Sequence, residues 1–357
     1  MTGENVPGES ISAVFRADLE PALQGREINA VMCRAAGAFL FARGNREDRS
    51  WQLGTYLRPG WGELPPEMLQ EQLVEVIRVA TGLPELDVTI EDHARWTTGA
   101  YLADRFRSGP VFLVGDAAHM MPPYGGFGGN TGVQDAHNLA WKISAVLRGD
   151  APNALLDTYE RERQPLDRLV VAQALLRSRK KPGDPPPPDQ IDATALALGF
   201  RYQNGGRVED PASPSGDPGT RAPHVAFTDG GSTPDLIDPT GFTLIGHSGL
   251  DQELASTRNV RVLGVARDDV AASFRARWDA TYAREDGGGL LIRPDGVIAV
   301  LVRPTSTEIA TRCRHSSITS PAHKVTGLQA CGRHDTGGRV AVCHSRCHSR
   351  LPTRPSH

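Results

Sequence analysis

One continuous run, from Val111 to Gly149, constrains the fold of this chain more than any other: VFLVGDAAHMMPPYGGFGGNTGVQDAHNLAWKISAVLRG. It begins with Val111–Val114, whose wholly apolar composition predicts a strand covered on both faces, as in a parallel α/β sheet. A glycine-rich loop follows, and the pattern then predicts a helix from about Asn130 to Leu147. This order of elements indicates a ligand site where the strand ends.

The loop has the chemistry of a site for a flat ligand that also carries hydroxyl groups. Asp116 follows the strand, and an ionised carboxylate only accepts hydrogen bonds, so a polyol such as a ribityl chain would suit it. Four glycines within five positions, Gly125 to Gly129, let the backbone approach a flat ligand closely. The unpaired N–H groups of the following helix would stabilise negative charge, which in a flavin develops at the N1 and C2 carbonyl edge on reduction.

The same run resembles the second FAD fingerprint of the para-hydroxybenzoate hydroxylase-like flavoprotein monooxygenases. More narrowly, GDAAHMMPPYGGFGGNTGVQDAHNLAWK and the later LLDTYERERQP resemble the hydroxylases of bacterial aromatic polyketides, in the phenol-hydroxylase-like branch. The resemblance implies that Asp116 binds the ribityl chain and that the backbone from Pro123 to Thr131 lies along the isoalloxazine ring. It implies no catalytic side chain and no metal ion. The expected cofactor-binding residues are Gly115, Asp116, Pro123, Gly125, Gly126, Phe127, Gly128, Gly129, Asn130 and Thr131.

The resemblance also implies a reaction. NAD(P)H would reduce FAD, O2 would add to the reduced flavin to give a C4a-hydroperoxide, and the distal oxygen would pass to an electron-rich aromatic ring. The expected substrate is a fused-ring polyketide or another phenol, while hydroxylation and Baeyer–Villiger insertion stay open. A net charge of −3 argues for no nucleic-acid partner. Without a long apolar run or a secretory signal, we expect a cytoplasmic protein that does not enter a membrane.

Patterns along the chain predict an α/β fold with several parts. Segments that alternate apolar and polar residues, together with a helix from Pro65 to Gly82, predict an antiparallel sheet with one buried face. By resemblance, this sheet is the α+β substrate-covering domain, residues 1–100. Residues 101–182 would be the C-terminal part of an incomplete, Rossmann-like FAD-binding domain. A proline-rich linker (183–219), a thioredoxin-like domain (220–304) and a disordered tail (305–357) would follow. No CxxC lies in 220–304, which leaves packing or homodimer formation as the role of that domain.

The front of the expected FAD site is missing. The family holds the FAD pyrophosphate with a strand, a G-x-G-x-x-G turn and a helix. Here Gly60-x-Gly62 is followed by Pro65, and Gly126-x-Gly128 by Thr131, where the third glycine should stand. Three interpretations are open: a gene whose start lies upstream, a partner chain that supplies the front, and an inactive remnant. We expect the first, a chain truncated at its N-terminus.

The composition changes from Thr305 onward. That segment has eight Lys and Arg against two acidic residues, and it contains four of the five cysteines. A frameshift in the coding sequence would produce such a change. The alternative is a zinc site, but a second pair of ligands at matching spacing is lacking. Its ligands would be Cys343, His344, Cys347 and His348.

Several polar residues near the glycine-rich loop have structural interpretations. His119 and Asp116 could form a dyad, but no nucleophile accompanies them, so we expect His119 to make a structural hydrogen bond. The pattern G-x-S-x-G of hydrolases is broken by Leu250. Asn130, Asp135 and Asn138 are expected as a helix cap and first-turn polar residues. Val133, Ala136, Ala140, Ile143 and Leu147 would form the apolar side that packs on the sheet, while Tyr159, Glu160 and Arg163 fit a solvated helix face.

Overall fold

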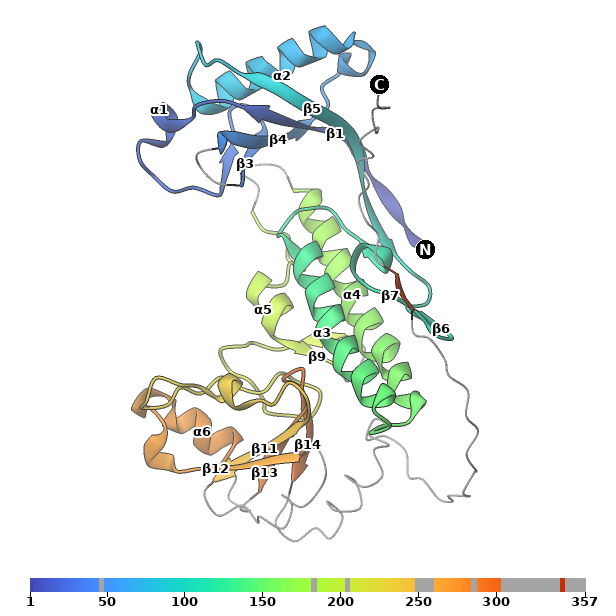
Figure 1. Cartoon of the computed structure of the whole chain (residues 1–357), viewed down its shortest axis with the longest axis vertical. Coiled ribbons are helices and arrows are strands. Elements are labelled where there is room, and N and C mark those ends of the chain that lie inside the picture. The colour runs from blue at the N-terminus through green and yellow to red at the C-terminus, as the bar shows by residue number, and fades with distance from the viewer. Residues whose placement is uncertain are drawn as a thin grey trace, which may run out of the picture. The chain divides into compact units, whose positions relative to one another are not determined.

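The computed structural model describes residues 1–44, 48–180, 185–202, 206–247, 260–283, 288–302 and 341–343 (Figure 1). These residues form two compact units. One unit consists of residues 4–99, and the other of residues 1–3 together with the described residues from 100 onward. The mixed α/β architecture predicted from the sequence is confirmed.

Residues 4–99 contribute most of a curved antiparallel sheet. Its strand order is β2 (Ala30–Cys33), β3 (Ala38–Arg43), β4 (Ser50–Tyr56), β1 (Thr2–Arg16), β5 (Thr89–Leu102) and β8 (His119–Met120). The register pairs Ile11 of β1 with Thr55 of β4, and Phe15 with Trp51. Residues alternate between the two faces of each strand, so one face becomes apolar and is buried.

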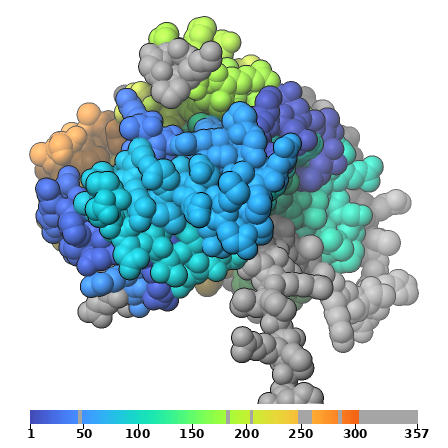
Figure 2. Space-filling model, turned by 90° about the horizontal axis from the view of Figure 1, so that it is seen from above, coloured from blue at the N-terminus to red at the C-terminus, as the bar shows by residue number. Residues whose placement is uncertain are grey.

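Helix α2 (Pro66–Thr81) covers the buried face of this sheet. Proline stands in its first turn, and Gly82 ends it in the left-handed conformation (φ +71°), as the sequence predicts. The core between helix and sheet is mainly apolar, and each fully buried leucine contributes about 1.5–3 kcal/mol. Its members include Ile11, Phe15, Leu40, Leu53, Leu69, Leu73, Val76 and Ile77. The outer side of α2 faces the viewer in Figure 2. A short helix, α1 (Glu20–Leu23), follows β1 in the chain.

The second unit is built around two long helices, α3 (Phe127–Leu147) and α4 (Asp157–Ser178). Beside them lies a small sheet in which β7 (Val111–Leu113) pairs antiparallel with β6 (Arg107–Ser108) and parallel with β15 (Ala341–Cys343). The prediction that this strand is covered on both faces is wrong, because Val111 is exposed and Leu113 is only half-buried. Only Phe112 and Val114 of the predicted run are buried, since an apolar run does not by itself determine how many layers cover a strand.

The segment predicted as a linker, 183–219, contains regular structure. It includes α5 (Ala193–Leu198), β9 (Phe200–Arg201) and β10 (Arg207–Val208). The side chain of Asp192 caps α5 by accepting hydrogen bonds from the backbone N–H groups of Thr194 and Ala195. Leu196 packs in a cluster with Val170 and Ala174 of α4. The high proline content did not reveal this anchoring, because a single buried leucine leaves no periodic pattern.

The C-terminal part of the second unit contains a four-stranded mixed sheet. Its order is β12 (Val260–Val265), β11 (Phe242–His247), β13 (Gly289–Ile292) and β14 (Ile298–Val302). β11 is parallel to β12 and antiparallel to β13, and α6 (Arg275–Thr281) supplies Trp278 to the core. The thioredoxin-like assignment stays a prediction. His344, Cys347 and His348 of the zinc alternative lie outside the described residues.

Among the helices that the structure describes, none combines the length and the apolarity needed to cross a bilayer.

Candidate flavin site

The candidate site begins where β7 ends. A short 3-10 turn, Gly115–Ala117, follows the strand and leaves the Asp116 carboxylate exposed. Gly115 has a φ of +60°, which favours glycine, and the backbone of α3 passes close to it. A Cβ atom on Gly132 would lie only 3.1 Å from the Cα of Gly115. Two glycines therefore allow the turn that carries Asp116 to lie directly against the helix.

Helix α3 begins at Phe127, three residues before the predicted start. Its N-cap is Gly126 (φ +66°), so no side chain caps the helix. The prediction that Asn130 is the cap is wrong, because Asn130 lies inside the first turn and its Nδ2 donates to the Gly126 carbonyl oxygen at 2.8 Å. Phe127 anchors this start in the cluster that contains Val170 and Leu196. The first backbone N–H groups of α3 therefore have no side-chain cap and can meet a ligand.

The predicted site residues divide into an exposed set, a buried pair and two half-buried glycines, Gly115 and Gly128. The exposed residues are Asp116, Pro123, Gly125, Gly126, Gly129 and Asn130. Phe127 and Thr131 are buried, and the Thr131 hydroxyl donates to the Phe127 carbonyl oxygen at 2.8 Å. At Gly125 (φ +96°) a Cβ atom would lie 2.4 Å from the Phe127 ring. The loop therefore offers its backbone rather than its side chains, which fits a flat ring at close approach.

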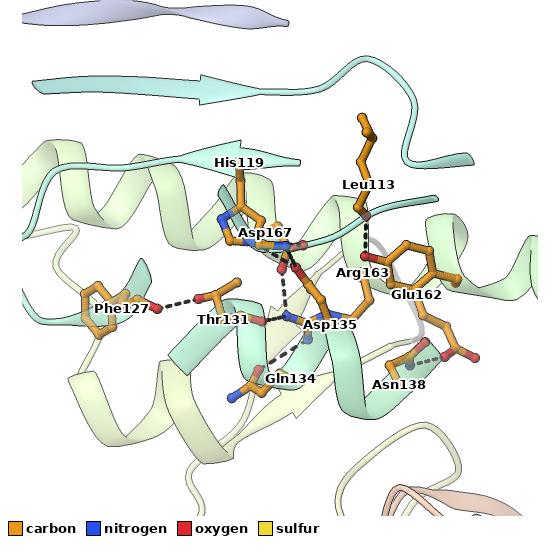
Figure 3. A network of polar contacts seen from close by, with 12 residues as sticks. Leu113, His119, Phe127, Thr131, Gln134, Asp135, Asn138, Glu162, Arg163 and Asp167 are labelled. Carbon is orange, nitrogen blue, oxygen red and sulfur yellow. Dashed lines mark hydrogen bonds and ion pairs between the residues drawn. The ribbon is translucent and has the colours of Figure 1, made fainter. Parts of the chain in front are cut away.

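Beneath this loop lies a buried polar network centred on Asp135 of α3 (Figure 3). Its Oδ2 accepts hydrogen bonds from the Gly115 backbone N–H at 3.1 Å and from His119 Nε2 at 2.8 Å. Its Oδ1 accepts from Nε of Arg163 at 2.7 Å. The expectation that Asp135 and Asn138 are first-turn polar residues is wrong, because both lie beyond the second turn of α3 and both side chains are buried. His119 does make the structural hydrogen bond predicted for it, to Asp135 rather than to Asp116.

Arg163 joins α4 to this network. Its Nη2 donates to Asp167 Oδ1 at 2.8 Å and to the Thr131 carbonyl oxygen at 3.4 Å, and its Nη1 donates to Gln134 at 3.2 Å. The guanidinium is completely buried, so the prediction of a solvated helix face is wrong for Arg163. The Arg163–Asp167 pair has the i,i+4 spacing of a helical ion pair, a signal that is visible in the sequence but does not reveal burial.

Two further residues assigned to the solvated face are also bonded inside the unit. Tyr159 is fully buried, and its hydroxyl donates to the Leu113 carbonyl oxygen at 2.7 Å. The Glu160 carboxylate accepts hydrogen bonds from the backbone N–H groups of Phe106 and Arg107 at 2.6 and 3.1 Å. Both side chains therefore fix the β6–β7 hairpin to α4.

A second polar cluster links α3 and α4 to the C-terminal sheet. Lys142 Nζ donates to Asn138 Oδ1 at 2.7 Å and to Glu162 Oε2 at 2.8 Å. Arg293 donates to both oxygens of Glu162, at 2.7 and 2.9 Å, and also pairs with Asp295. Burial lowers the pKa of Lys142 to about 8. Burial acts to raise the pKa of Glu162, but Arg293 and Lys142 outweigh it and hold that pKa well below its usual range.

The apolar side predicted for α3 holds only at Ile143, which is half-buried and packs against the cluster that contains Phe112 and Leu139; for the other four residues it is wrong. Val133 and Leu147 are 70% and 65% exposed, and Ala136 and Ala140 are exposed as well. The buried side instead combines polar and apolar residues, because paired charges can be buried where each finds its partner. Those residues are Phe127, Thr131, Asp135, Asn138, Leu139, Lys142 and Ala145.

In the unit formed by residues 4–99, the sheet face opposite α2 presents exposed apolar side chains. Phe39 and Phe41 of β3 stack with ring centroids 6.2 Å apart and an interplanar angle of 9°. Met32 of β2 pairs with Phe39 in the sheet register, and both side chains are exposed. Aromatic faces of this kind suit contact with a flat, fused-ring molecule.

Comparisons with known proteins agree with this geometry. Residues 1–174 match the family model described as an FAD binding domain. Those residues are therefore similar to FAD-binding domains. The chain is 37% identical to a 4-methyl-5-nitrocatechol 5-monooxygenase of Burkholderia sp, over 83% of this chain and 60% of that relative. It is 36% identical to the tetracenomycin A2 monooxygenase-dioxygenase of Streptomyces glaucescens, over 84% of this chain and 58% of that relative.

Solved structures give the same result. The model is similar to an aklavinone-11 hydroxylase in ternary complex with FAD and aklavinone, with a TM-score of 0.70 and 30% identity over 87% of this chain and 62% of that one. The resemblance to the aromatic and polyketide hydroxylases is thus confirmed. The chain spans about 60% of the length of the curated relatives it matches.

Proposed function

We propose that this chain acts in an FAD-dependent monooxygenase that oxidises a small aromatic, polyketide-type molecule, with NAD(P)H and O2 as co-substrates. The observation that carries the proposal is the exposed Asp116 at the end of β7, lying against a helix whose N-terminus has no side-chain cap. On this side of its site a flavin requires two features. One is a carboxylate that accepts hydrogen bonds from its hydroxyl groups, and the other is a helix N-terminus that stabilises its negative charge.

In this proposal each part of the loop has a separate task. Asp116 accepts hydrogen bonds from the ribityl hydroxyls, and the backbone of Gly125 to Thr131 lies along the ring edge. The N-terminus of α3 stabilises negative charge at that edge, which is electrostatic stabilisation by fixed dipoles. When bound, FAD would supply the transfer of electrons from NAD(P)H and the activation of O2, chemistry for which proteins depend on a cofactor.

For the substrate we propose the open sheet face of residues 4–99. The stacked Phe39 and Phe41 rings and the exposed Met32 would contact a flat aromatic substrate. The relatives support this class, since their names include tetracenomycin and aklavinone oxygenases. Homodimer formation through residues 220–304 is a further proposal.

A second candidate function is a flavin-binding fragment that needs another segment to bind FAD tightly. It is favoured by the absence of a G-x-G-x-x-G turn from the sequence, because that turn supplies the pyrophosphate contacts in this family. Adding a separately produced segment with a strand, a G-x-G-x-x-G turn and a helix should raise FAD affinity in this case and leave it unchanged otherwise.

The test is a titration of the purified chain with FAD, followed by flavin absorbance and fluorescence. We expect a saturable complex whose affinity falls about 10- to 100-fold in Asp116→Ala, since hydrogen bonds to a charged group contribute about 1.5–3 kcal/mol. Asp268→Ala is the matched control, because the Asp268 side chain is 97% exposed and lies in the C-terminal part of the second unit. Equal affinities for the wild type and Asp116→Ala would refute the assignment.

A further inference from the structure

Four buried side chains from three elements meet directly beneath the Gly115–Asp116 turn. They are His119 of β8, Asp135 of α3, and Arg163 and Asp167 of α4 (Figure 3). All four side chains are 0% exposed. His119 Nε2 lies 2.8 Å from Asp135 Oδ2 and 4.0 Å from Asp167 Oδ2. Arg163 donates to Oδ1 of each carboxylate, at 2.7 and 2.8 Å. We call these four residues the buried cluster.

The charges of the buried cluster do not balance without an additional proton. Two carboxylates face a single guanidinium, which leaves one negative charge away from water, and an unpaired buried charge is strongly unfavourable. Within the described residues, neither Asp167 Oδ2 nor His119 Nδ1 has a hydrogen-bond partner. One proton, held on the unpartnered Oδ2 of Asp167, would neutralise the cluster.

The surrounding groups do not supply the missing positive charge. Tyr159 of α4 and Tyr202, which follows β9, face the cluster, and burial raises the pKa of each phenol, that of Tyr202 to about 12. Both tyrosines are therefore neutral at physiological pH. The neighbouring charged set consists of Glu162, Asp295, Lys142 and Arg293, two acids and two bases that balance one another.

The buried cluster is bonded to both parts of the proposed flavin site. Asp135 Oδ2 accepts from the backbone N–H of Gly115, the residue before Asp116. Arg163 Nη2 donates to the carbonyl oxygen of Thr131, near the start of α3. If the carboxylates of Asp135 and Asp167 moved apart, the Gly115–Asp116 turn would therefore shift relative to the N-terminus of α3.

We propose that the buried cluster is a positioning device: it retains one proton on Asp167, and it thereby fixes the Asp116 turn against the N-terminus of α3. Retention of the proton is a property of the folded chain and needs no ligand. The expected effect on FAD binding rests on the proposed function. Asp135 and Arg163 are positioning residues in this scheme, because they act through Gly115 and Thr131 rather than by touching the cofactor.

A divalent cation is the alternative occupant. The ligand atoms of His119, Asp135 and Asp167 lie within 4.8 Å of one another, which is close enough for a metal site. However, Arg163 already donates to both carboxylates, and a second cation would be placed beside a buried guanidinium. We therefore favour the proton, and metal analysis of the purified chain separates the two.

The proton is tested by urea unfolding between pH 6.5 and 8.5. If the folded chain holds one proton that the unfolded chain releases, the unfolding constant of the wild type rises about tenfold per pH unit relative to Asp167→Asn, whose cluster needs no extra proton. Asp157→Asn is the control, since Asp157 lies on the same helix but is 62% exposed. Parallel pH profiles for the wild type and Asp167→Asn would overturn the retained proton. So would a stoichiometric metal whose removal abolishes the pH dependence.

The positioning role is tested with Asp135→Asn in the full chain, under conditions in which the variant is folded. FAD affinity should fall at least tenfold and the flavin absorption bands should shift, whereas Leu291→Ala, a core change in the C-terminal sheet, should alter only stability. If the wild type binds FAD and Asp135→Asn binds it equally with an unchanged spectrum, the positioning role is wrong and the proposed function stands. If the wild type binds no FAD, the proposed function fails, while the pH result still decides the proton.

Discussion

The two helix-packing regions of this molecule use opposite chemistry. Between α2 and its sheet, the buried side chains are almost all apolar, and Thr55 is the buried polar side chain on that face of β4. Between α3 and α4, the buried side chains include an arginine, a lysine and two aspartates, each bonded to a neighbour. Apolar packing tolerates small displacements, whereas a buried ion network fixes specific atoms in place. The rigid network lies beneath the glycine-rich loop that we propose binds the flavin, and the apolar core supports a sheet.

The largest effect is expected from breaking the ion network. Arg163→Met leaves two carboxylates buried without their partner, which should lower the free energy of unfolding by about 3–5 kcal/mol. Urea unfolding at neutral pH measures this loss. Arg161→Met on the same helix is the control, because Arg161 is exposed and should change stability by less than about 0.5 kcal/mol. Similar small losses in both variants would show that the network is not a determinant of stability.

The apolar core should respond next. Leu73 of α2 is completely buried, and Leu73→Ala should cost about 3 kcal/mol, through lost transfer free energy and the cavity left behind. Met68→Ala on the same helix serves as the control, since Met68 is 49% exposed. Because residues 4–99 form a compact unit of their own, we expect this loss without any change in FAD affinity.

This contrast explains what could be predicted from the sequence. The strands of residues 4–99 and the ends of α2 follow from alternation, from a helical apolar stripe, and from Pro66 and Gly82 at the helix ends. Each of these signals is local. The glycine-rich loop and Asp116 could also be placed, because glycine and a strand end have direct conformational consequences.

The ion network could not be predicted in the same way. Asp135 and Arg163 are 28 residues apart, and their pairing depends on how α3 packs against α4. A charged residue on a helix is usually solvated, so periodicity assigned Arg163 to the surface and Val133 to the interior, and both assignments were wrong. Phe127 was placed in a loop for a related reason, since the glycines around it concealed its role as the anchor of α3.

A smaller, pH-dependent effect is expected from Lys142. Its pKa of about 8 lies below the ordinary value of 10.5, so above pH 8 the folded state has released a proton that the unfolded state still holds. This contribution to stability is absent below pH 8 and grows as the pH rises towards 10.5. Relative to Lys142→Met, the wild type should gain about 2 kcal/mol in unfolding free energy between pH 7 and 10, since one pKa unit corresponds to about 1.4 kcal/mol. A constant difference across this range would contradict the burial of an amine with a lowered pKa.

The smallest effect is expected on the exposed side of α3. Val133→Ser and Leu147→Ser should each change the unfolding free energy by no more than about 0.5 kcal/mol, because both side chains are mostly exposed. Leu139→Ala on the same helix is the comparison; that side chain is 2% exposed, and its loss should cost about 2–5 kcal/mol. A loss above about 1.5 kcal/mol in Val133→Ser would mean that this side of α3 is covered in solution. Sedimentation of the wild type at several concentrations would then show whether a second copy covers it, since only self-association makes the stability depend on protein concentration.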